Sequence, residues 1–406
     1  MGGRLATAAA YASPHVLRNV LHISQADGGG GSARSAYRLH STLRDLGWGS
    51  RMLVGERHGS DPDVRTLKRS VAWRAADRAS AAVLNRLDLQ YVFYPSSFGV
   101  ARDPWFRDAS VVQLYNTHGS YFSHTALPYL SRRRPVVWRL SDQWAFTGHV
   151  AYSYDCERWR EGCGSCPYLS EYPRLRRDTT AALWRWKNRV YSRSRLTIVA
   201  PSTWLERLAK ESPLLGRFDV RRIPNGIDLE LFRPRERPQR EKPVVLFASA
   251  WLDDRRKGGH LLQEAVGRLA DLDFDLVSAG DRATVGRALG RLTPEELARA
   301  YGEADVFVLP TLAENLPNAA IESLACGTPV VSFDVGGMPD AVRHLETGYL
   351  AKLADADALA EGIRALLMDE ALREKMSATC REVAQREFST DVEAKRFVEL
   401  YEEVLN

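Results

Sequence analysis

The stretch "TLAENLPNAAIESLACGTPVV", residues 311–331, decides the fold class and also indicates a binding site. Two apolar runs, "DVFVLP" (305–310) and "PVVSFDV" (329–335), flank its centre and predict consecutive buried strands. Pro317 suits the first turn of a helix and Gly327 suits a helix end, so the sequence predicts a helix over about 317–326. A strand, a short helix and a second strand in this order are typical of an α/β sheet.

Two glutamates in this stretch, Glu314 and Glu322, are separated by eight positions. Eight residues along a helix span about 12 Å, which exceeds the roughly 5 to 9.5 Å between the paired carboxylates of a glycoside hydrolase. We therefore expect the two acids to contact opposite ends of one long ligand, while the helix N-terminus binds a phosphate or diphosphate between them. The structural alternative is that one acid stabilises its own helix and the other is solvated.

Length and composition predict a compact protein of several domains. A chain of 406 residues, 45% of them hydrophobic, predicts two or three domains with substantial cores. No stretch approaches the roughly 18 consecutive apolar residues of a membrane span, and the Ala-rich "RLATAAAYASPH" (4–15) is a poor signal peptide. The five cysteines, three of them crowded together, do not resemble a secreted disulfide scaffold. These observations favour a cytoplasmic location.

Strands and helices alternate in both halves of the chain. In the first half, runs such as "VLHIS", "SVVQLYN", "PVVWRL" and "LTIVAPS" predict a parallel sheet covered on both faces. A turn-rich, charged linker near 222–242 precedes "VVLFASA", where the alternation restarts. The sequence predicts a domain of residues 1–222, a second of 223–388, and a C-terminal helix in 389–406 that packs back towards the first domain. Because ligands of open α/β sheets bind at the carboxyl ends of the strands, we expect a cleft between the two domains.

A glycine loop follows the first predicted strand. The residues Gly28–Gly31 precede a helix pattern that starts at Ser32, and they permit close backbone approach to a ligand. They also fit G-x-G-x-x-A at Gly28, Gly30 and Ala33, with Glu56 as a ribose-binding acid, so a nicotinamide dehydrogenase is a competing hypothesis. The loop by itself does not decide between a dehydrogenase and a protein that binds the long phosphate-containing ligand inferred above.

The motifs of the second half resemble the retaining nucleotide-sugar glycosyltransferases of family 4, which have the GT-B fold of two Rossmann-like α/β domains facing each other across a cleft. Glu314 and Glu322 match the E-x7-E pattern, and "IPNGID" (223–228), "RKGGHLL" (256–262) and "GGMPDAV" (336–342) support it. This ordered set favours glycosyl transfer over dehydrogenation.

The resemblance implies a metal-independent, retaining enzyme that needs no cofactor for catalysis. Such an enzyme moves a hexosyl group from a nucleoside diphosphate sugar to a hydroxyl acceptor, in polysaccharide, glycolipid or glycosylated natural-product biosynthesis. A GT-B-like sugar-nucleotide epimerase and a non-catalytic nucleotide-sugar-binding protein are the alternatives.

The resemblance also implies roles for individual residues. Glu314 is expected near the reacting carbon of the donor sugar, and Glu322 at the ribose. Lys257 is expected to stabilise the departing diphosphate, although a plain surface lysine is the alternative. Trp251 and Leu252 stand where family members commonly have an arginine, which leaves Arg255 or Arg256 as the second cation. The predicted donor-binding residues are Gly29, Gly30, Gly31, Arg255, Arg256, Lys257, Asn315, Leu316, Pro317, Asn318 and Glu322.

His118 and Asp142 are the polar candidates in the first half. His118 follows a predicted strand and is expected to line the acceptor side of the cleft, with a hydrogen-bonded structural histidine as the alternative. The family often has a histidine at the position of Ser141, so Asp142 becomes the polar candidate near the donor sugar. The predicted catalytic residues are therefore Glu314, Lys257, His118 and Asp142, and no carboxylate is assigned as a general base.

A cysteine-rich segment, "GHVAYSYDCERWREGCGSCP", offers a metal site. Its His149, Cys156, Cys163 and Cys166 have ligand types that suit tetrahedral zinc, and C-x-x-C is a spacing typical of two ligands. A structural zinc would hold a long loop in place, whereas free thiols or a redox bridge are the alternatives. Three apparent D-x-D patterns, at 61–63, 273–275 and 355–357, lie in a predicted loop, strand and helix start respectively, and acids at a helix start need no metal to explain them. A metal-dependent transferase is therefore not favoured.

Charge divides the chain into two parts. Residues 1–222 contain 34 Lys and Arg against 18 Asp and Glu, a net charge of +16, and the rest, with the remaining 22 and 33, has −11. The cations include Arg132–Arg134 and "LWRWKNRVYSRSR" (183–195), where tryptophans interleave with them. We predict peripheral contact with the inner face of an anionic membrane, or an anionic or lipid-linked acceptor. A solvated arginine-rich surface is the alternative, and nucleic acid is not expected.

Overall fold

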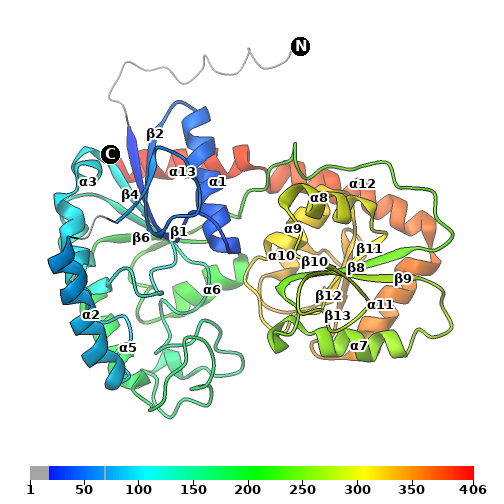
Figure 1. Cartoon of the computed structure of the whole chain (residues 1–406), viewed down its shortest axis with the longest axis horizontal. Helices are drawn as coiled ribbons and strands as arrows, with labels where there is room; N and C mark the ends of the chain where they lie inside the picture. The colour runs from blue at the N-terminus through cyan, green and yellow to red at the C-terminus, as the bar shows by residue number, and fades with distance from the viewer. Residues whose placement is uncertain (1–17, 68–69) are drawn as a thin grey trace. The chain divides into compact units, whose positions relative to one another are not determined.

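The computed structural model describes residues 18–67 and 70–406 and divides the chain into two compact α/β units (Figure 1). Unit 1 comprises the residues up to Val199, Ala209–Arg221 and Ala394–Asn406, and unit 2 comprises Ala200–Leu208 and Arg222–Glu393. The main division is next to the boundary expected at 222/223. Two features were not expected: residues 200–208 cluster with unit 2, and the last helix is divided between the units. The segment 4–15 lies outside the described residues.

Unit 1 is built on a seven-stranded sheet with the order β3-β2-β1-β4-β5-β6-β7. The pairs from β3 through β6 are parallel, as the sequence predicts. The strands are β1 (Asn19–Ala26), β2 (Gly49–Glu56), β3 (Val64–Thr66), β4 (Val111–Leu114), β5 (Val136–Arg139), β6 (Leu196–Ala200) and β7 (Asp219–Arg222). The helices are α1 (Gly31–Asp45), α2 (Val71–Arg86), α3 (Pro104–Asp108), α4 (Leu127–Leu130) and α5 (Thr180–Tyr191), together with the C-terminal parts of α6 (Thr203–Glu211) and α13 (Thr390–Leu405).

Burial explains why these segments adopt their structures. All four residues of β4 and all four of β5 are buried, as is typical of parallel strands covered by helices on both faces. In α1, Ala36, Leu39 and Leu43 are buried and follow helical spacing, so one face of the helix packs on the sheet. The helix ends before Gly47, whose φ of +84° a residue with a side chain rarely adopts.

The C-terminal part of α13 packs within unit 1. Tyr401 and Phe397 are fully buried there, and the Tyr401 hydroxyl donates a hydrogen bond of 2.9 Å to Oε1 of Gln113 on β4. The sheet of unit 1 therefore holds the end of the chain. In the described ranges, no helix has the length and apolar character needed to span a bilayer.

Unit 2 contains a six-stranded, fully parallel sheet with the order β10-β9-β8-β11-β12-β13. Counted along this unit, the order is 3-2-1-4-5-6, which is the Rossmann order. The strands are β8 (Val244–Trp251), β9 (Asp275–Asp281), β10 (Arg287–Gly290), β11 (Val306–Leu309), β12 (Val330–Phe333) and β13 (Gly348–Ala351). The helices are α7 (Gly259–Gly267), α8 (Pro294–Glu303), α9 (Asn318–Ala325), α10 (Met338–Ala341), α11 (Ala356–Met368) and α12 (Glu370–Glu387).

Alternate residues of β8 enter different cores of unit 2. Val244 and Leu246 pack in the core that α8, α9 and α12 cover, whereas Val245 and Phe247 pack in the core that α7 and α11 cover. Because successive side chains of a strand point to opposite faces, an unbroken apolar strand requires helices on both sides. Figure 1 shows these two helical layers around the sheet.

The deciding stretch folds as predicted, with its helix one residue shorter at each end. Pro317 is the N-cap of α9 and Cys326 its C-cap, and Gly327 follows with a φ of +74°. The linker over 223–243 has neither helix nor strand apart from one bridge at Ile227. The Asp355–Asp357 pattern is also a helix start, because the Asp355 carboxylate accepts from the N–H groups of Asp357 and Ala358.

The basic–aromatic segment of α5 is only partly exposed. Trp184 and Lys187 are buried, and Nζ of Lys187 donates to the carbonyl oxygens of Trp144 and Thr147. Burial lowers the pKa of Lys187 to about 7. Lys187 therefore belongs to the interior of unit 1, and of the cations in α5, Arg185 and Arg189 are exposed.

Candidate functional site

The predicted donor-binding residues of unit 2 gather where its strand order reverses. The reversal lies between β8 and β11, and ligands of such sheets bind outside the carboxyl ends of the strands at this point. Arg256 and Lys257 lie in the segment after β8, and Glu314 lies in the segment after β11. The chain topology thus brings together residues that are almost sixty positions apart in the sequence.

Glu314 forms the centre of a charged group with both cations. Its Oε1 accepts a hydrogen bond of 2.9 Å from Nη1 of Arg256 and another from Nζ of Lys257. Burial alone would raise the pKa of this carboxyl, but Lys257 and Arg256 together lower it to about 2. Glu314 is therefore ionised at neutral pH and holds two positive charges at the end of the sheet.

The structure distinguishes between the two candidate arginines. Arg256 contacts Glu314 and donates a second hydrogen bond of 2.9 Å to the carbonyl oxygen of Ala313, whereas Arg255 is exposed. Trp251, at the end of β8, is 48% exposed, and the guanidinium of Arg282 lies 5.1 Å from its ring. Arg256 is thus the cation that accompanies Lys257.

Glycine lets the cation-bearing turn approach β11. Gly258 has a φ of +73°, and a Cβ there would lie 1.8 Å from the carbonyl oxygen of Pro310. The carbonyl oxygen of Arg256 accepts from the Leu312 N–H at 2.8 Å and from the Thr311 hydroxyl at 3.1 Å. Any side chain at position 258 would push the turn away and separate Lys257 from Glu314.

The other motifs hold the loop that leads into α9. Asn225 of "IPNGID" donates to the carbonyl oxygen of Leu316 at 3.2 Å and to Oδ1 of Asn318 at 3.0 Å. A Cβ at Gly336 or Gly337 of "GGMPDAV" would lie within 2 Å of a carbonyl oxygen in this loop. Pro317 gives α9 no side-chain cap, and the first turn carries no acid, so a ligand anion there would meet no competing carboxylate.

Glu322 and Asn315 complete the predicted donor group. Glu322 is 3% exposed and lies on α9, and Oδ1 of Asn315 accepts a hydrogen bond of 2.5 Å from the Ser202 hydroxyl. Neither Ser202 nor Asn225 was predicted to be functional. Asn225 lies within a quoted motif, whereas nothing in the sequence near Ser202 indicates its contact with residue 315.

In unit 1, the strand order reverses between β1 and β4, and the glycine loop lies at this point. Gly29 has a φ of +88°, and Gly30 is the N-cap of α1, with no other atom within 4 Å of a Cβ built there. The Asp27 carboxylate accepts from the backbone N–H groups of His58 and Gly59 at 2.7 and 2.9 Å. The loop and the unobstructed N-terminus of α1 can therefore accept an anion.

His118 and Asp142, the other predicted catalytic residues, contact each other in unit 1. Nε2 of His118 lies 3.0 Å from Oδ2 of Asp142, and the ring packs edge-on against Trp144 with 5.1 Å between ring centres. Oδ1 of Asp142 accepts from the Trp144 N–H at 2.9 Å, which fixes the carboxylate. Both residues follow carboxyl ends of central strands, β4 and β5 respectively, and the pair can hold or transfer a proton.

Glu56, the ribose acid of the dehydrogenase hypothesis, lies at the end of β2. Its carboxylate is 75% exposed, and its Oε1 lies 3.8 Å from Nε2 of His58. Ser141, at the position where a histidine was expected from the resemblance, lies with its hydroxyl 2.8 Å from that of Ser32 in α1.

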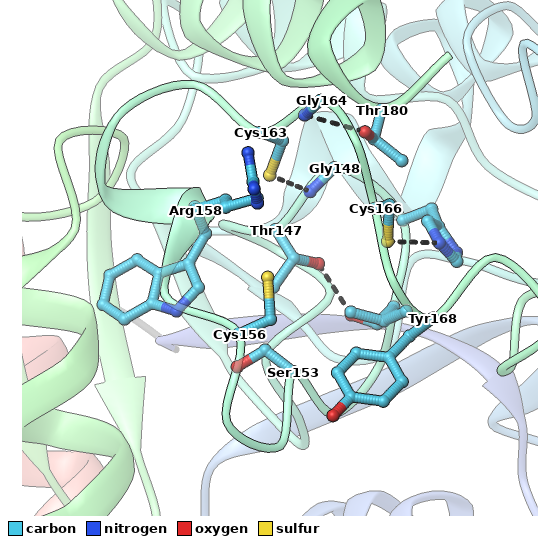
Figure 2. Close-up of a pocket in the computed structure, with 13 residues that line it drawn as sticks. Thr147, Gly148, Ser153, Cys156, Arg158, Cys163, Gly164, Cys166, Tyr168 and Thr180 are labelled. Atoms are coloured by element: carbon cyan, nitrogen blue, oxygen red, sulfur yellow. Dashed lines mark hydrogen bonds between the residues drawn. The ribbon is translucent and has the colours of Figure 1, made fainter. Parts of the chain in front are cut away.

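The four predicted zinc ligands line one small cavity of about 20 Å³ in unit 1 (Figure 2). Sγ of Cys166 lies 3.5 Å from Nε2 of His149, whose Nδ1 lies 3.0 Å from the carbonyl oxygen of Pro173. Sγ of Cys163 accepts from the Gly148 N–H at 3.1 Å. All five cysteines are free thiols, and no three His, Cys, Asp or Glu side chains of the described residues already converge as a metal site. Zinc binding stays a prediction.

Comparisons with known proteins identify the relatives of unit 2 and of the whole fold. Residues 242–369 match the model of the family described as "Glycosyl transferases group 1". Over 37% of this chain, the sequence is 34% identical to D-inositol 3-phosphate glycosyltransferase 1 of Catenulispora acidiphila, and the match covers 44% of that protein. The chain spans about half the length of the curated relatives that it matches.

Solved structures share the architecture over nearly the whole chain. Sucrose-phosphate synthase from Thermosynechococcus elongatus superposes with a TM-score of 0.67 at 19% identity, covering 95% of this chain and 99% of that one. Anabaena HepE, solved in complex with UDP-glucose, gives a TM-score of 0.65 at 14% identity, covering 95% and 99%. The protein has the GT-B fold of two Rossmann-like units.

Proposed function

We propose that this protein is a retaining glycosyltransferase that moves a hexosyl group from a nucleoside diphosphate sugar to a hydroxyl acceptor. The observation that carries the proposal is the group of Glu314, Arg256 and Lys257 at the strand reversal of unit 2, next to the start of α9. The family match over the same segment and the HepE complex with UDP-glucose support this class of donor.

The residues of unit 2 have the charges that such a reaction needs. As the bond between the anomeric carbon and the diphosphate breaks, negative charge collects on the departing diphosphate, and two cations with a helix N-terminus stabilise it. Glu314 orients Arg256 and Lys257 and lies at the sugar end, whereas Glu322 binds the ribose. We propose that these groups act without a divalent metal.

The proposed transfer forms a bond from the acceptor oxygen to the anomeric carbon on the face that the diphosphate leaves. Because attack and departure share one face, the departing phosphate oxygen is the nearest base for the acceptor's proton. Unit 1 would bind the acceptor, with His118 and Asp142 as polar contacts. The charge of +16 over residues 1–222 and the phosphorylated inositol named for the Catenulispora relative favour an anionic or lipid-linked acceptor, as in glycolipid or polysaccharide synthesis on the cytoplasmic side.

A panel of UDP, GDP, ADP and dTDP sugars tests the donor class, because a ligand that binds only the native state raises the melting temperature. With the stabilising donor and a panel of hydroxyl acceptors, including phosphorylated polyols, we expect release of nucleoside diphosphate and a product with retained anomeric configuration. Epimerised sugar nucleotide from donor alone would instead identify an epimerase. Donor binding without turnover on any acceptor would favour the non-catalytic alternative, and stabilisation by NAD alone would favour a dehydrogenase.

A further inference from the structure

A large basic concavity lies in unit 1, away from the candidate catalytic and donor-binding residues of that unit. Its volume is about 800 Å³, and its lining includes five arginines. We call it the arginine concavity and define it by Arg132, Arg133, Arg134, Arg195 and Arg217.

The arginine concavity lies at the amino ends of the strands of unit 1, whereas His118 and Asp142 lie at the carboxyl ends. Arg132–Arg134 precede β5, and Arg195 precedes β6, so both segments lie at the amino ends of these parallel strands. His118 and Asp142 follow the carboxyl ends of β4 and β5. A strand of four residues spans about 13 Å, so an anion in the concavity would not contact these two residues.

The charge of the arginine concavity is not neutralised within the described part of the chain, where none of the five arginines pairs with a carboxylate. The single acid of the lining, Asp219, already accepts two hydrogen bonds of 2.8 Å from Nε of Arg221. Uncompensated cations on several segments attract anions strongly.

Neutral contacts fix the positions of three of these guanidinium groups. Arg133 donates to the carbonyl oxygen of Tyr129 at 2.9 Å and stacks on its ring at 3.6 Å. Arg134 donates to the carbonyl oxygen of Arg107 at 2.6 Å, and Arg217 donates to Oδ1 of Asn188 at 2.6 Å. These guanidiniums are therefore held in place without losing their charge, and the planar form of the exposed Arg133 and Arg217 suits phosphate oxygens.

We propose that the arginine concavity docks unit 1 on the phosphate groups of an anionic phospholipid membrane. The concavity is far wider than one phosphate, and its exposed guanidiniums come from three separate segments, so the fitting partner presents several phosphates side by side. Nucleic acid also does so, but the only aromatic residues of the lining, Tyr191 and Phe218, are buried and half-buried and offer no platform for bases. No exposed large apolar side chain lines it, so binding depends on charge and is sensitive to salt.

The test compares two double variants with the same change in charge. Arg132→Ser with Arg195→Ser removes two exposed arginines of the concavity whose side chains make no hydrogen bond within the described residues. Arg185→Ser with Arg189→Ser removes two exposed arginines of α5 outside it. Melting temperatures close to that of the wild type check that both variants fold.

We expect the wild-type chain to co-sediment with vesicles of phosphatidylcholine and phosphatidylglycerol, and not with phosphatidylcholine alone. Each cation at such a surface contributes a factor of about five, so the concavity variant should bind about thirty-fold more weakly and the α5 variant much less so. No binding to the anionic vesicles, or equal losses in both variants, would overturn the proposal. Saturable binding of pyrophosphate that displaces the vesicles and is lost in the concavity variant would identify a soluble phosphate ligand instead. Tighter binding to duplex DNA than to the vesicles would also overturn it. The outcome does not depend on glycosyl transfer.

Discussion

Replacing Glu314 by Gln separates the structural role of its charge from its role in ligand binding. The carboxylate is buried between Arg256 and Lys257, and these cations lower its pKa from the usual 4.5 to about 2 despite burial, which acts in the opposite direction. This difference corresponds to about 3 kcal/mol of folding free energy at neutral pH. For a unit of this size, the loss should lower the melting temperature of unit 2 by about 6–12 °C.

The pH dependence of this loss follows from the direction of the pKa change. A carboxyl with a lowered pKa in the folded state stabilises the fold above its unfolded pKa, and the contribution disappears as the pH falls from about 4.5 towards 2. The difference in folding free energy between the wild type and Glu314→Gln should therefore fall to roughly half by about pH 3. Calorimetry measures this difference, and addition of the stabilising nucleoside diphosphate identifies the transition of unit 2.

A matched control replaces Glu303 by Gln. Glu303 pairs with Arg240 at 3.0 Å in a partly exposed position of the same unit, and such a pair contributes about 0 to 1 kcal/mol. Glu314→Gln should also keep or improve its affinity for free nucleoside diphosphate, because both cations are released, while transfer is lost. Three results would refute the reasoning: an unchanged melting temperature in Glu314→Gln, a stability difference from the wild type that does not change with pH, or a clear loss of affinity for the diphosphate.

Three further predictions test the other predicted residues. If the Glu322 carboxylate binds the ribose, Glu322→Ala should weaken binding of free nucleoside diphosphate at least ten-fold, because a hydrogen bond to a charged group contributes about 1.5–3 kcal/mol. Titration calorimetry measures this affinity, and an unchanged value would remove the assignment. If the pair acts on a proton in the reaction, His118→Asn and Asp142→Asn should each lower the transfer rate about 100-fold or more and leave donor affinity unchanged. Initial rates and thermal shifts measure these two quantities, and a structural role would lower both the rate and the donor affinity. Protein purified without chelators should contain about one zinc per chain, lost in Cys163→Ser with Cys166→Ser; metal analysis without zinc in the wild type would reject the site.

The sequence by itself determined the α/β class, the position of the helix after the deciding loop and the identity of the charged residues. Local chemistry sufficed for these, because apolar runs specify buried strands, and Pro317 and Gly327 delimit a helix wherever they occur. The short strands β3, β7, β10 and β13 were not predicted, because their sequences VRT, DVRR, RALG and GYLA lack the run of apolar, β-branched residues that indicated the equally short β4, β5, β11 and β12.

Only the tertiary structure decided which of the two arginines contacts Glu314 and which charges of the basic half are exposed. Arg255 and Arg256 are equivalent in the sequence, but the turn that Gly258 permits against Pro310 directs Arg256 to the carboxylate. Lys187 appeared to belong to a basic surface, yet α5 turns it into the interior, where carbonyl oxygens solvate it. The arginine concavity brings together Arg132–Arg134, Arg195 and Arg217, which are far apart in the sequence. Such choices depend on contacts between distant segments, and the order of residues along a chain does not contain them until the strands have paired.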